Sequence, residues 1–383
     1  MKAVVLAGGA GRGLSAITGG KPKTLIPIAG KKVIEYVIEC LIRNNINDIV
    51  LVTDKPHEFE DVTVKYGGLV RFEVRKQEGQ EVIGAILTAK DELSKGSILF
   101  YGDTLVDCDA VKMIIDTFNQ FKDPTLMVVP EEDVTLYGAI KVLPNGFVGE
   151  MIEKPKEPIE GYYAYGGLAI LCKDMLELIE SYNSFDKAVN EFINKGGKVR
   201  AAIWSGSWID IGYTWNILEA IYFALNKLNR SYISSKASIS SKAVIEGPVI
   251  IEDDAFIDHN VIIKGPAYIG RNTFIGAYSF IRPYTALESD INVSSYVEVV
   301  WSSIQPYVTI GRMSFLGYSV VGSNSVIEPN VLTKLIVDPE KAGIKAIREF
   351  KRRREYFKIG AFIGHNMRVK AYSVLEPGTL ISS

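Results

Sequence analysis

The six-residue period of the last third of the chain is the strongest constraint on its fold. From about residue 235, an aliphatic residue recurs at every sixth position, and a small or β-branched residue stands two positions before each of them. The aliphatic positions are Ile239, Ile245, Ile251, Ile257, Ile263, Ile269, Ile275, Ile281 and Leu287. This period fits neither an α-helix nor an ordinary hairpin, and it is typical of hexapeptide repeats that coil into a left-handed parallel β-helix. We expect the aliphatic residues to point inward and the small residues to stand where the chain turns a corner.

The register resumes in two further runs after Leu287. The first run is Ile304, Ile310 and Leu316, and the second is Ile363, Val369, Leu375 and Ile381. Between the last two runs, residues 338–358 are polar and rich in Lys and Arg. We expect this basic insertion to be a loop or a short helix that leaves the β-helix, and a plain solvated charge run is the alternative. The β-helix domain is therefore predicted over residues 230–383.

The first two-thirds of the chain, residues 1–229, alternate strand-like and helix-like patterns. Strands are predicted at 3–6, 48–53, 70–74 and 97–101, and helices at 33–44, 82–93 and 215–229. This alternation predicts an α/β domain with a mostly parallel, Rossmann-like sheet and helices on both faces. Right-handed crossovers would place the ends of strands 3–6 and 97–101 at the same edge of that sheet.

A glycine-rich turn follows the first predicted strand. The turn is Ala7-Gly8-Gly9-Ala10-Gly11-Arg12-Gly13, and Lys21-Pro22-Lys23 follows it. Glycines let backbone N–H groups approach an anion closely, and the lysines and arginine add full positive charges. The pattern predicts a polyphosphate site opening at residue 7, with a glycine turn that binds nothing as the alternative. The P-loop pattern fails because Pro22 follows Gly20-Lys21, and the dinucleotide pattern fails because its third glycine stands one place early.

A third phosphate motif fits the stretch better. Residues 6–11, Leu14, Ile17-Thr18 and Pro22-Lys23 resemble the signature of sugar-1-phosphate nucleotidylyltransferases. The resemblance implies a nucleotide site made by Leu6, Ala7, Gly8, Gly9, Gly11, Arg12 and Lys23, with Arg12 and Lys23 acting in catalysis.

The match departs from the family signature at two places. The family has Thr-Arg after its third glycine, whereas this chain has Arg12-Gly13, and Ala16 replaces the family's proline. Two interpretations stay open: Arg12 takes over the role of the family's arginine, or its guanidinium points elsewhere.

Two acidic residues are candidates for a metal site. Asp103 follows a predicted strand and a glycine at the expected phosphate edge, where a carboxylate is suited to hold Mg²⁺, although a simple turn aspartate is the alternative. Tyr101-Gly102-Asp103 resembles the metal-binding Gly-Asp of the same family. Trp208-Ile209-Asp210-Ile211-Gly212 resembles the family segment that supplies the second carboxylate. The resemblance thus implies catalytic Mg²⁺ on Asp103 and Asp210.

Later segments resemble the sugar-phosphate site of the family. Tyr137-Gly138 and Glu153-Lys154-Pro155 match two of its motifs, in which the glutamate accepts bonds from sugar hydroxyls and the lysine meets the phosphate. A solvated strand edge is the alternative for the charged pair. The family's Asn-[AT]-Gly appears here as Tyr165-Gly166-Gly167, and its base-reading Gly-Thr appears as Glu81-Val82-Ile83. The implied sugar-phosphate residues are Tyr137, Gly138, Glu153, Lys154, Tyr165 and Gly167, with Lys154 acting in catalysis.

The two-part layout resembles the bifunctional enzymes that make UDP-N-acetylglucosamine, and their archaeal relatives. Their acetyltransferase domain uses a histidine as general base, and Arg312 stands in the corresponding segment here. An arginine cannot accept a proton near neutral pH, and we do not expect His259 or His365 to replace the base.

These observations order the candidate functions. The first is a Mg²⁺-dependent nucleotidylyltransferase that converts a nucleoside triphosphate and a sugar-1-phosphate into a sugar nucleotide and pyrophosphate. The alternative is a regulatory or binding paralogue without turnover, and an acyltransferase comes last. Outward positions of the repeats carry apolar side chains, which predicts a homo-oligomer, a trimer packed through residues 235–330. They are Val244, Ile250, Phe256, Ile262, Tyr268, Phe274 and Phe280.

Composition and cysteine usage limit the partners and the compartment. A net charge of −2 gives no drive towards nucleic acid or anionic membranes, and no apolar run reaches the ~18 residues of a membrane span. Cys40, Cys108 and Cys172 are far apart in the sequence, and we expect buried free thiols in a reducing compartment. Met1 leads directly into a strand, so we expect no secretory signal and a cytoplasmic protein.

Overall fold

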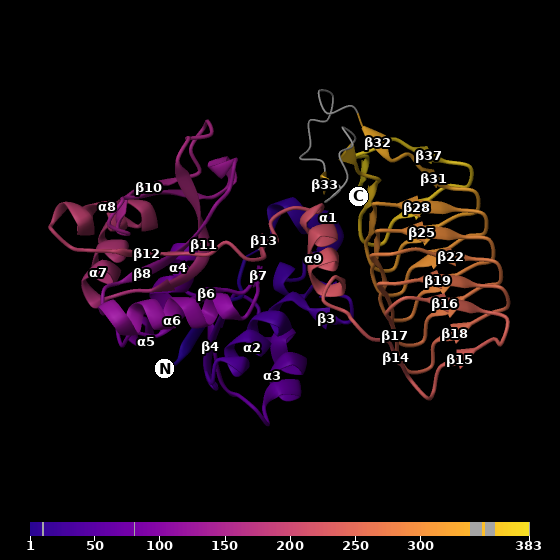
Figure 1. Ribbon diagram of the computed structural model, residues 1–383, viewed down its shortest axis with the longest axis horizontal. Coiled ribbons are helices and arrows are strands. Elements are labelled where there is room, and N and C mark those ends of the chain that lie inside the picture. The colour runs from indigo at the N-terminus through magenta and orange to yellow at the C-terminus, as the bar shows by residue number, and fades with distance from the viewer. Residues whose placement is uncertain (10, 80, 338–346, 349–356, 383) are drawn as a thin grey trace. The chain divides into compact units, whose positions relative to one another are not determined.

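The computed structural model describes residues 1–9, 11–79, 81–337, 347–348 and 357–382, which form two compact units (Figure 1). The first unit consists of Met1–Gly9 and Val33–Asp210, and the second of Ala10–Lys32 and Ile211–Ser383. Residues 10–32 therefore belong, by their contacts, with the C-terminal part of the chain. The sequence-based boundary between residues 229 and 230 stays a prediction.

A nine-stranded sheet forms the centre of the first unit. Its main path is β10 (Val148–Glu153), β9 (Gly138–Val142), β11 (Tyr162–Ile170), β6 (Ile98–Tyr101), β1 (Ala3–Leu6), β4 (Asp48–Thr53) and β5 (Arg71–Lys76). The remaining strands are β8 (Thr125–Val129), which pairs with β11, and β12 (Arg200–Ile203), which pairs with β8. The part from β6 to β5 is parallel, whereas β11 runs antiparallel to β6, β8 and β9.

Helices pack against this sheet with their apolar stripes. They are α2 (Val33–Arg43), α3 (Glu60–Tyr66), α4 (Glu81–Thr88), α5 (Lys90–Leu93), α6 (Asp109–Phe121), α7 (Lys173–Tyr182) and α8 (Phe185–Asn194). In α2 the helical spacing buries Val33, Val37 and Leu41, as the sequence predicts. The predicted helix over 82–93 is interrupted, because Ala89 leaves the helical conformation between α4 and α5.

Two of the three cysteines are bonded, so the prediction of three free thiols is wrong. Cys40 of α2 and Cys108, which precedes α6, form a disulfide with their Cα atoms 4.7 Å apart. The 68 residues that separate them in sequence gave no local signal of this contact. Cys172 is the free cysteine, and burial raises the pKa of its thiol.

We expect the disulfide to stabilise the first unit measurably. Closing a loop of this length removes unfolded-state entropy worth roughly 4 kcal/mol in the chain-entropy treatment. The variant Cys40→Ser should lower the free energy of unfolding by up to about that amount in denaturant titrations. Cys172→Ser is the control. Thiol titration of the denatured wild type should find one thiol without reductant and three with it. Three thiols without reductant would contradict the bond.

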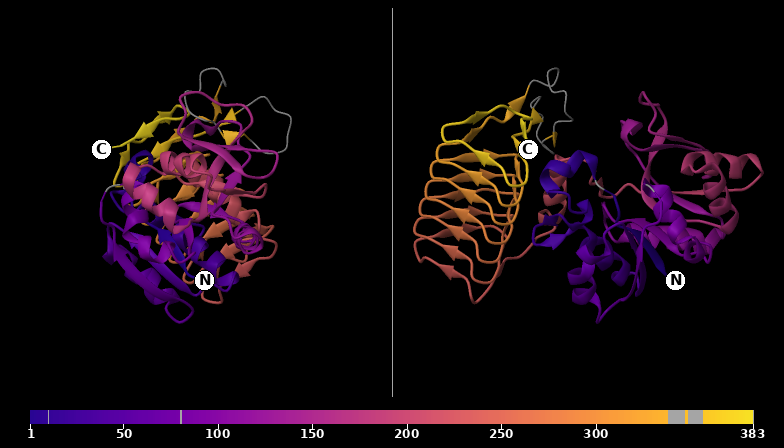
Figure 2. Two further views of the ribbon diagram at one scale, coloured as in Figure 1. Left: turned by 90° about the vertical axis from the view of Figure 1, so that its left-hand side faces the viewer. Right: turned by 180° about the vertical axis from the view of Figure 1, so that it is seen from behind.

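The second unit contains the predicted β-helix, whose short strands stack into three parallel sheets (Figures 1 and 2). Sheet D contains β14 (Tyr232–Ile233), β17 (Val249–Ile251), β20 (Ala267–Ile269), β23 (Thr285–Leu287), β26 (Ser303–Ile304), β29 (Val320–Val321), β35 (Phe362–Ile363) and β38 (Leu380–Ile381). Sheet E contains β15 (Ser238–Ile239), β18 (Phe256–Ile257), β21 (Phe274–Ile275), β24 (Asn292–Val293), β27 (Thr309–Ile310), β30 (Val326–Ile327) and β36 (Arg368–Val369). Sheet F contains β16 (Val244–Glu246), β19 (Ile262–Lys264), β22 (Phe280–Ile281), β25 (Glu298–Val300), β28 (Phe315–Gly317), β31 (Leu332–Thr333) and β37 (Val374–Leu375).

The interior of the β-helix follows the predicted register. From Ile251 to Leu287 each predicted inward residue is fully buried, and Ile239 and Ile245 of the first coil are partly buried. The predicted fold class, a Rossmann-like domain followed by a left-handed β-helix of hexapeptide repeats, is confirmed. The basic insertion lies outside the described residues, except for 347–348 and 357–358.

Residues 10–32 and α9 (Asn216–Leu225) pack within the second unit. The segment 10–32 contains η1 (Arg12–Leu14), α1 (Ser15–Thr18), η2 (Lys23–Leu25) and a hairpin of β2 (Pro27–Ile28) and β3 (Lys31–Lys32). The N–H of His365 donates to the carbonyl oxygen of Ala16 at 2.7 Å, and the ring of Tyr222 in α9 stacks on Trp301 at 5.5 Å. Among the described residues, no helix combines the length and apolar character that a membrane crossing requires.

Candidate active site

The ends of β1 and β6 bring the first carboxylate next to the glycine turn. The N–H of Gly102 donates to the carbonyl oxygen of Leu6 at 2.8 Å, so Asp103 follows β6 where Ala7 and Gly8 follow β1. This is the carboxyl edge of the parallel strands, where ligands of α/β sheets bind.

The second carboxylate reaches the same edge through a two-stranded sheet. Strand β7 (Thr104–Val106) pairs antiparallel with β13 (Trp208–Asp210), and Asp210 lies opposite Thr104. Asp103 is the residue before Thr104, so the two aspartates occupy neighbouring positions in the pair. The structure thus brings together two residues that are far apart in the sequence.

Several carboxylates at this edge lie near the partly buried phenol of Tyr101. Burial raises the pKa of Tyr101 well above its ordinary range, and the nearby Tyr165 and the charges of Glu153, Asp103 and Asp210 act in the same direction. The described residues contain no group of three or more His, Cys, Asp or Glu side chains able to hold a metal by themselves. A pair of aspartates fits Mg²⁺, which takes one or two carboxylates and completes its shell with water and substrate phosphates.

The predicted sugar-phosphate residues gather on β9, β10 and β11. Glu153 lies opposite Gly138, and the N–H of Lys154 donates to the carbonyl oxygen of Tyr137 at 3.0 Å. The Lys154 Nζ lies 4.0 Å from the Glu153 Oε1. Partial burial raises the pKa of Glu153, whereas the charge of Lys154 lowers it. The carboxylate of Glu153, the ammonium of Lys154 and the backbone of Tyr137 and Gly138 therefore lie together.

Two further predicted residues join this group from β11. Gly167 has a φ of +79°, and a Cβ there would lie 2.7 Å from the Thr104 Oγ1, so only glycine allows this close approach. Tyr165 is 8% exposed, and its ring meets that of Tyr101 edge to face at 5.6 Å. A bulky buried aromatic residue therefore stands where the family has a small amide.

Gln77 is a candidate residue that the sequence reasoning missed. A Cβ at Gly8 would lie 2.3 Å from the Gln77 Oε1, so this amide packs directly on the glycine turn. Its Nε2 donates to the carbonyl oxygen of Glu81 at 2.8 Å. Glu81 itself has a φ of +54°, a backbone conformation that glycine adopts more easily. The available signal was the position of Gln77 directly after β5, at the carboxyl edge of a parallel strand.

The remaining predicted phosphate-binding residues, Gly11, Arg12 and Lys23, belong to the second unit. Gly11 has a φ of +51°, and a Cβ there would lie 3.2 Å from the Cβ of Lys23, so the lysine stem packs across this glycine. A Cβ at Gly13 would lie 2.5 Å from the carbonyl oxygen of Gly212. The backbone leaves no room for a side chain at residue 13, which explains why an arginine there, as in the family signature, does not fit this chain.

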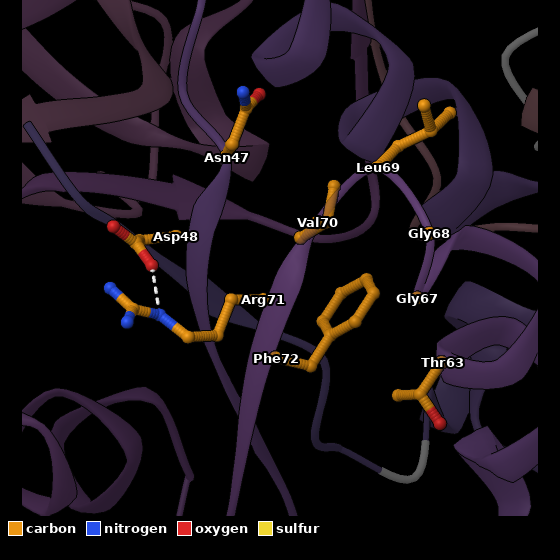
Figure 3. A pocket seen from close by; sticks show the side chains of 9 residues that line it. All are labelled: Asn47, Asp48, Thr63, Gly67, Gly68, Leu69, Val70, Arg71 and Phe72. Atoms are coloured by element: carbon orange, nitrogen blue, oxygen red, sulfur yellow. Dashed lines mark hydrogen bonds and ion pairs between the residues drawn. The ribbon is translucent and has the colours of Figure 1, made fainter.

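The first unit also has a surface hollow, and the described part of the second unit contains His259 and His365. A surface hollow between β4, β5 and α3 is lined by residues 47–48, Thr63 and 67–72, and it contains none of the predicted site residues (Figure 3). His259 is exposed and its Nδ1 lies 2.7 Å from Asp258, while the ring of His365 packs against Gly19. Neither histidine lines that hollow.

Comparisons with known proteins identify the families that the two regions of the chain match. Residues 2–227 match the nucleotidyl transferase family model, and residues 248–283 match the model of the bacterial transferase hexapeptide (six repeats). The chain is 30% identical to a bifunctional protein GlmU of Methanococcus maripaludis, across 100% of this chain and 92% of the relative. It is also 30% identical to a bifunctional sugar-1-phosphate nucleotidylyltransferase/acetyltransferase of Sulfurisphaera tokodaii, across 100% and 94%.

A solved structure resembles part of the chain. It is a putative glucose-1-phosphate thymidylyltransferase from Bacillus anthracis, with a TM-score of 0.53 and 25% identity, covering 61% of this chain and 98% of that one. The chain belongs to the nucleotidyl transferase family, and hexapeptide repeats follow its transferase region.

Proposed function

We propose that the chain is a Mg²⁺-dependent sugar-1-phosphate nucleotidylyltransferase. The observation that carries the proposal is that Asp210 lies opposite Thr104, next to Asp103, at the edge where the glycine turn follows β1. Glu153 and Lys154, which suit a sugar phosphate, belong to the same unit. The names of the full-length relatives and of the solved thymidylyltransferase support the same class of reaction.

The reaction is an in-line displacement at the α-phosphorus of a nucleoside triphosphate. A phosphate oxygen of the sugar-1-phosphate forms the new P–O bond, the bond between the α-phosphorus and the bridging oxygen breaks, and pyrophosphate leaves with that electron pair. The protein contributes positioning and charge neutralisation rather than covalent chemistry. Lys154 would hold the incoming sugar phosphate, and Glu153 would accept bonds from sugar hydroxyls. Asp103 and Asp210 would hold Mg²⁺, which when bound neutralises charge that develops on the phosphates.

Pyrophosphate release across a matrix of nucleoside triphosphates and sugar-1-phosphates tests the function. Turnover with at least one pair supports the proposal and identifies the base and the sugar. Tight binding without turnover would favour the alternative, a regulatory paralogue, which the altered positions Gly13, 81–83 and Tyr165 support. The same preparation, incubated with acetyl-CoA and glucosamine-1-phosphate, should form no acetylated product, because Arg312 stands where a base is needed.

We also propose that the protein works in the cytoplasm, where nucleoside triphosphates are available. We further propose that it is a homotrimer. On sheet F the outward residues Val244, Ile262, Leu332 and Val374 are exposed although they are apolar. On sheet E the exposed rings of Phe256 and Phe274 stack at 5.5 Å. Tyr268, which was predicted to face outward into the same strip, is instead buried against Gly30. The apolar surface that remains on sheets E and F suits a second copy of the chain.

We expect the wild type to scatter light with the mass of three chains. The variant Ile262→Glu places a charge within the apolar strip and should shift the mass towards one chain. Leu69→Glu, at an exposed leucine of the first unit, is the matched control and should leave the mass unchanged. Removal of residues 230–383 is a poorer test, because residues 10–32 pack with that part of the chain. A monomeric wild type would rule the trimer out.

A further inference from the structure

The hairpin at residues 27–32 is attached to the β-helix by a buried carboxylate. The N–H of Ala29 donates to the Glu288 Oε1 at 2.8 Å, and the N–H of Gly30 donates to the Glu288 Oε2 at 3.0 Å. The two oxygens of one carboxylate thus accept hydrogen bonds from the N–H groups of two successive residues, one each. Hydrogen bonds to a charged acceptor are roughly twice as strong as neutral ones.

The carboxylate is mounted on a rigid part of the fold. Glu288 follows β23, its N–H donates to the carbonyl oxygen of Ile304 at 2.9 Å, and its own carbonyl oxygen accepts from the Thr273 Oγ1 at 3.0 Å. Its side chain is 2% exposed, and burial raises its pKa to about 7, against the effect of the two N–H donors. A buried carboxylate is costly unless it is hydrogen-bonded, so the hairpin and the carboxylate depend on each other.

The backbone conformation of this turn requires support from residues outside the hairpin. Ala29 has a φ of +48° and Gly30 a φ of +84°, which is the conformation of a tight two-residue hairpin turn. Alanine disfavours positive φ, and such strain persists only where the surroundings enforce it. The ring of Tyr268 lies so close to Gly30 that an added Cβ would be 2.4 Å from its hydroxyl.

Other contacts hold the same segment to the β-helix. The Gln305 Nε2 donates to the carbonyl oxygen of Pro27 at 3.2 Å. The N–H of His365 donates to the carbonyl oxygen of Ala16 at 2.7 Å. The segment between β1 and α2 is therefore held at Ala16 and at residues 27–30 by residues that lie about 260 to 350 positions away in the chain.

We propose that Glu288 is a positioning residue for the triphosphate. Through the turn at Ala29 and Gly30 it holds residues 10–32, which carry Gly11, Arg12 and Lys23, in their binding conformation. The inference rests on the proposed function, because the role of these three residues is part of it. It gives the β-helix a task in nucleotidyl transfer that does not depend on acetyl transfer.

Two variants and one matched control test the anchor. Glu288→Gln keeps one acceptor but presents an N–H₂ to the other backbone N–H, and Glu288→Ala removes both acceptors. Glu328→Gln is the control, because Glu328 also accepts a backbone N–H, from Ala371 at 2.9 Å, within the same β-helix. All three are made in the full chain, and circular dichroism and light scattering establish that they fold and assemble like the wild type.

Hydrogen exchange and steady-state kinetics give separate readouts. We expect the amide hydrogens of Ala29 and Gly30 to exchange at least tenfold faster in Glu288→Ala than in the wild type, with Glu288→Gln between them. The KM for the nucleoside triphosphate should rise about tenfold or more in Glu288→Ala, while the KM for the sugar-1-phosphate stays within about twofold. Glu328→Gln should change neither quantity.

The outcomes separate the anchor from the proposed function. Unchanged exchange at Ala29 and Gly30 in Glu288→Ala would overturn the anchor. Faster exchange with an unchanged KM for the triphosphate, or an equal rise in both KM values, would overturn the positioning role. A wild type that turns over no substrate pair, but whose exchange responds as expected, would overturn the proposed function and leave the anchor supported.

Discussion

Asp103→Asn is expected to abolish pyrophosphate release while leaving the fold intact. An amide has the shape of the carboxylate but lacks its charge, so the variant would hold Mg²⁺ weakly. A metal ion contributes several kcal/mol of charge stabilisation, and each 1.36 kcal/mol is a factor of ten in rate. We therefore expect a loss on the order of 10³-fold or more in kcat/KM, and a comparable loss in Asp210→Asn. The melting temperature should not fall, because the substitution removes negative charge from a crowded region.

Asp109→Asn is the matched control for this prediction. Asp109 is six residues further along, in the first turn of α6, and is exposed. Its substitution should leave turnover unchanged within about twofold. Measurement of the rate against Mg²⁺ concentration separates loss of metal binding from loss of chemistry. Full activity of Asp103→Asn would show that the metal assignment is wrong.

The sequence patterns predict two features well: which residues of the repeats are buried, and which strand ends meet at one edge of the sheet. The six-residue repeat leaves one register for the inward residues, so the buried set from Ile251 to Leu287 follows directly from the spacing. The right-handed crossovers predicted that the ends of β1 and β6 lie at one edge of the sheet. The hydrogen bond from the Gly102 N–H to the Leu6 carbonyl oxygen confirms this prediction.

Contacts between distant segments are the features that spacing does not predict. Nothing in a local pattern indicates that Cys40 meets Cys108, or that residues 10–32 pack with the β-helix. Glu288 stands at a corner of the repeats, where a solvent-exposed acid would look the same in the sequence. Its function depends on a hairpin 258 residues away. Tyr268, which was predicted to face outward, is likewise buried by a distant segment of the chain, because its ring packs against Gly30.

Steric contacts also changed the interpretation of the Arg12-Gly13 pair. The sequence alone left open whether Arg12 takes over the role of the family's arginine or points elsewhere. The structure requires glycine at residue 13 for space, because Gly212 approaches within 2.5 Å of where a Cβ would stand. The arginine that the family places at that point therefore has no room in this chain, and residue 12 is the neighbouring position that offers a guanidinium.

We accordingly expect Arg12→Ala to lower kcat by on the order of 10²-fold or more. Loss of one charge-stabilising donor aimed at developing charge costs about this much. Arg12→Lys should recover only part of the rate, since an ammonium keeps the charge but lacks the planar fork that binds phosphate at two points. Single-turnover measurements at saturating nucleotide report the chemical step and separate it from weaker binding.

Two control variants test the role of Arg12. Lys242→Ala removes an exposed cation of the β-helix and should change kcat by less than about threefold. The double variant Arg12→Thr, Gly13→Arg restores the order of the family signature, but its new side chain meets the Gly212 backbone, so we expect it to be inactive. If Arg12→Ala is silent and the double variant gains activity instead, Arg12 is not the activating residue. The chain would then be a regulatory paralogue that has lost the family's activating arginine, because an arginine placed at residue 13 would restore activity.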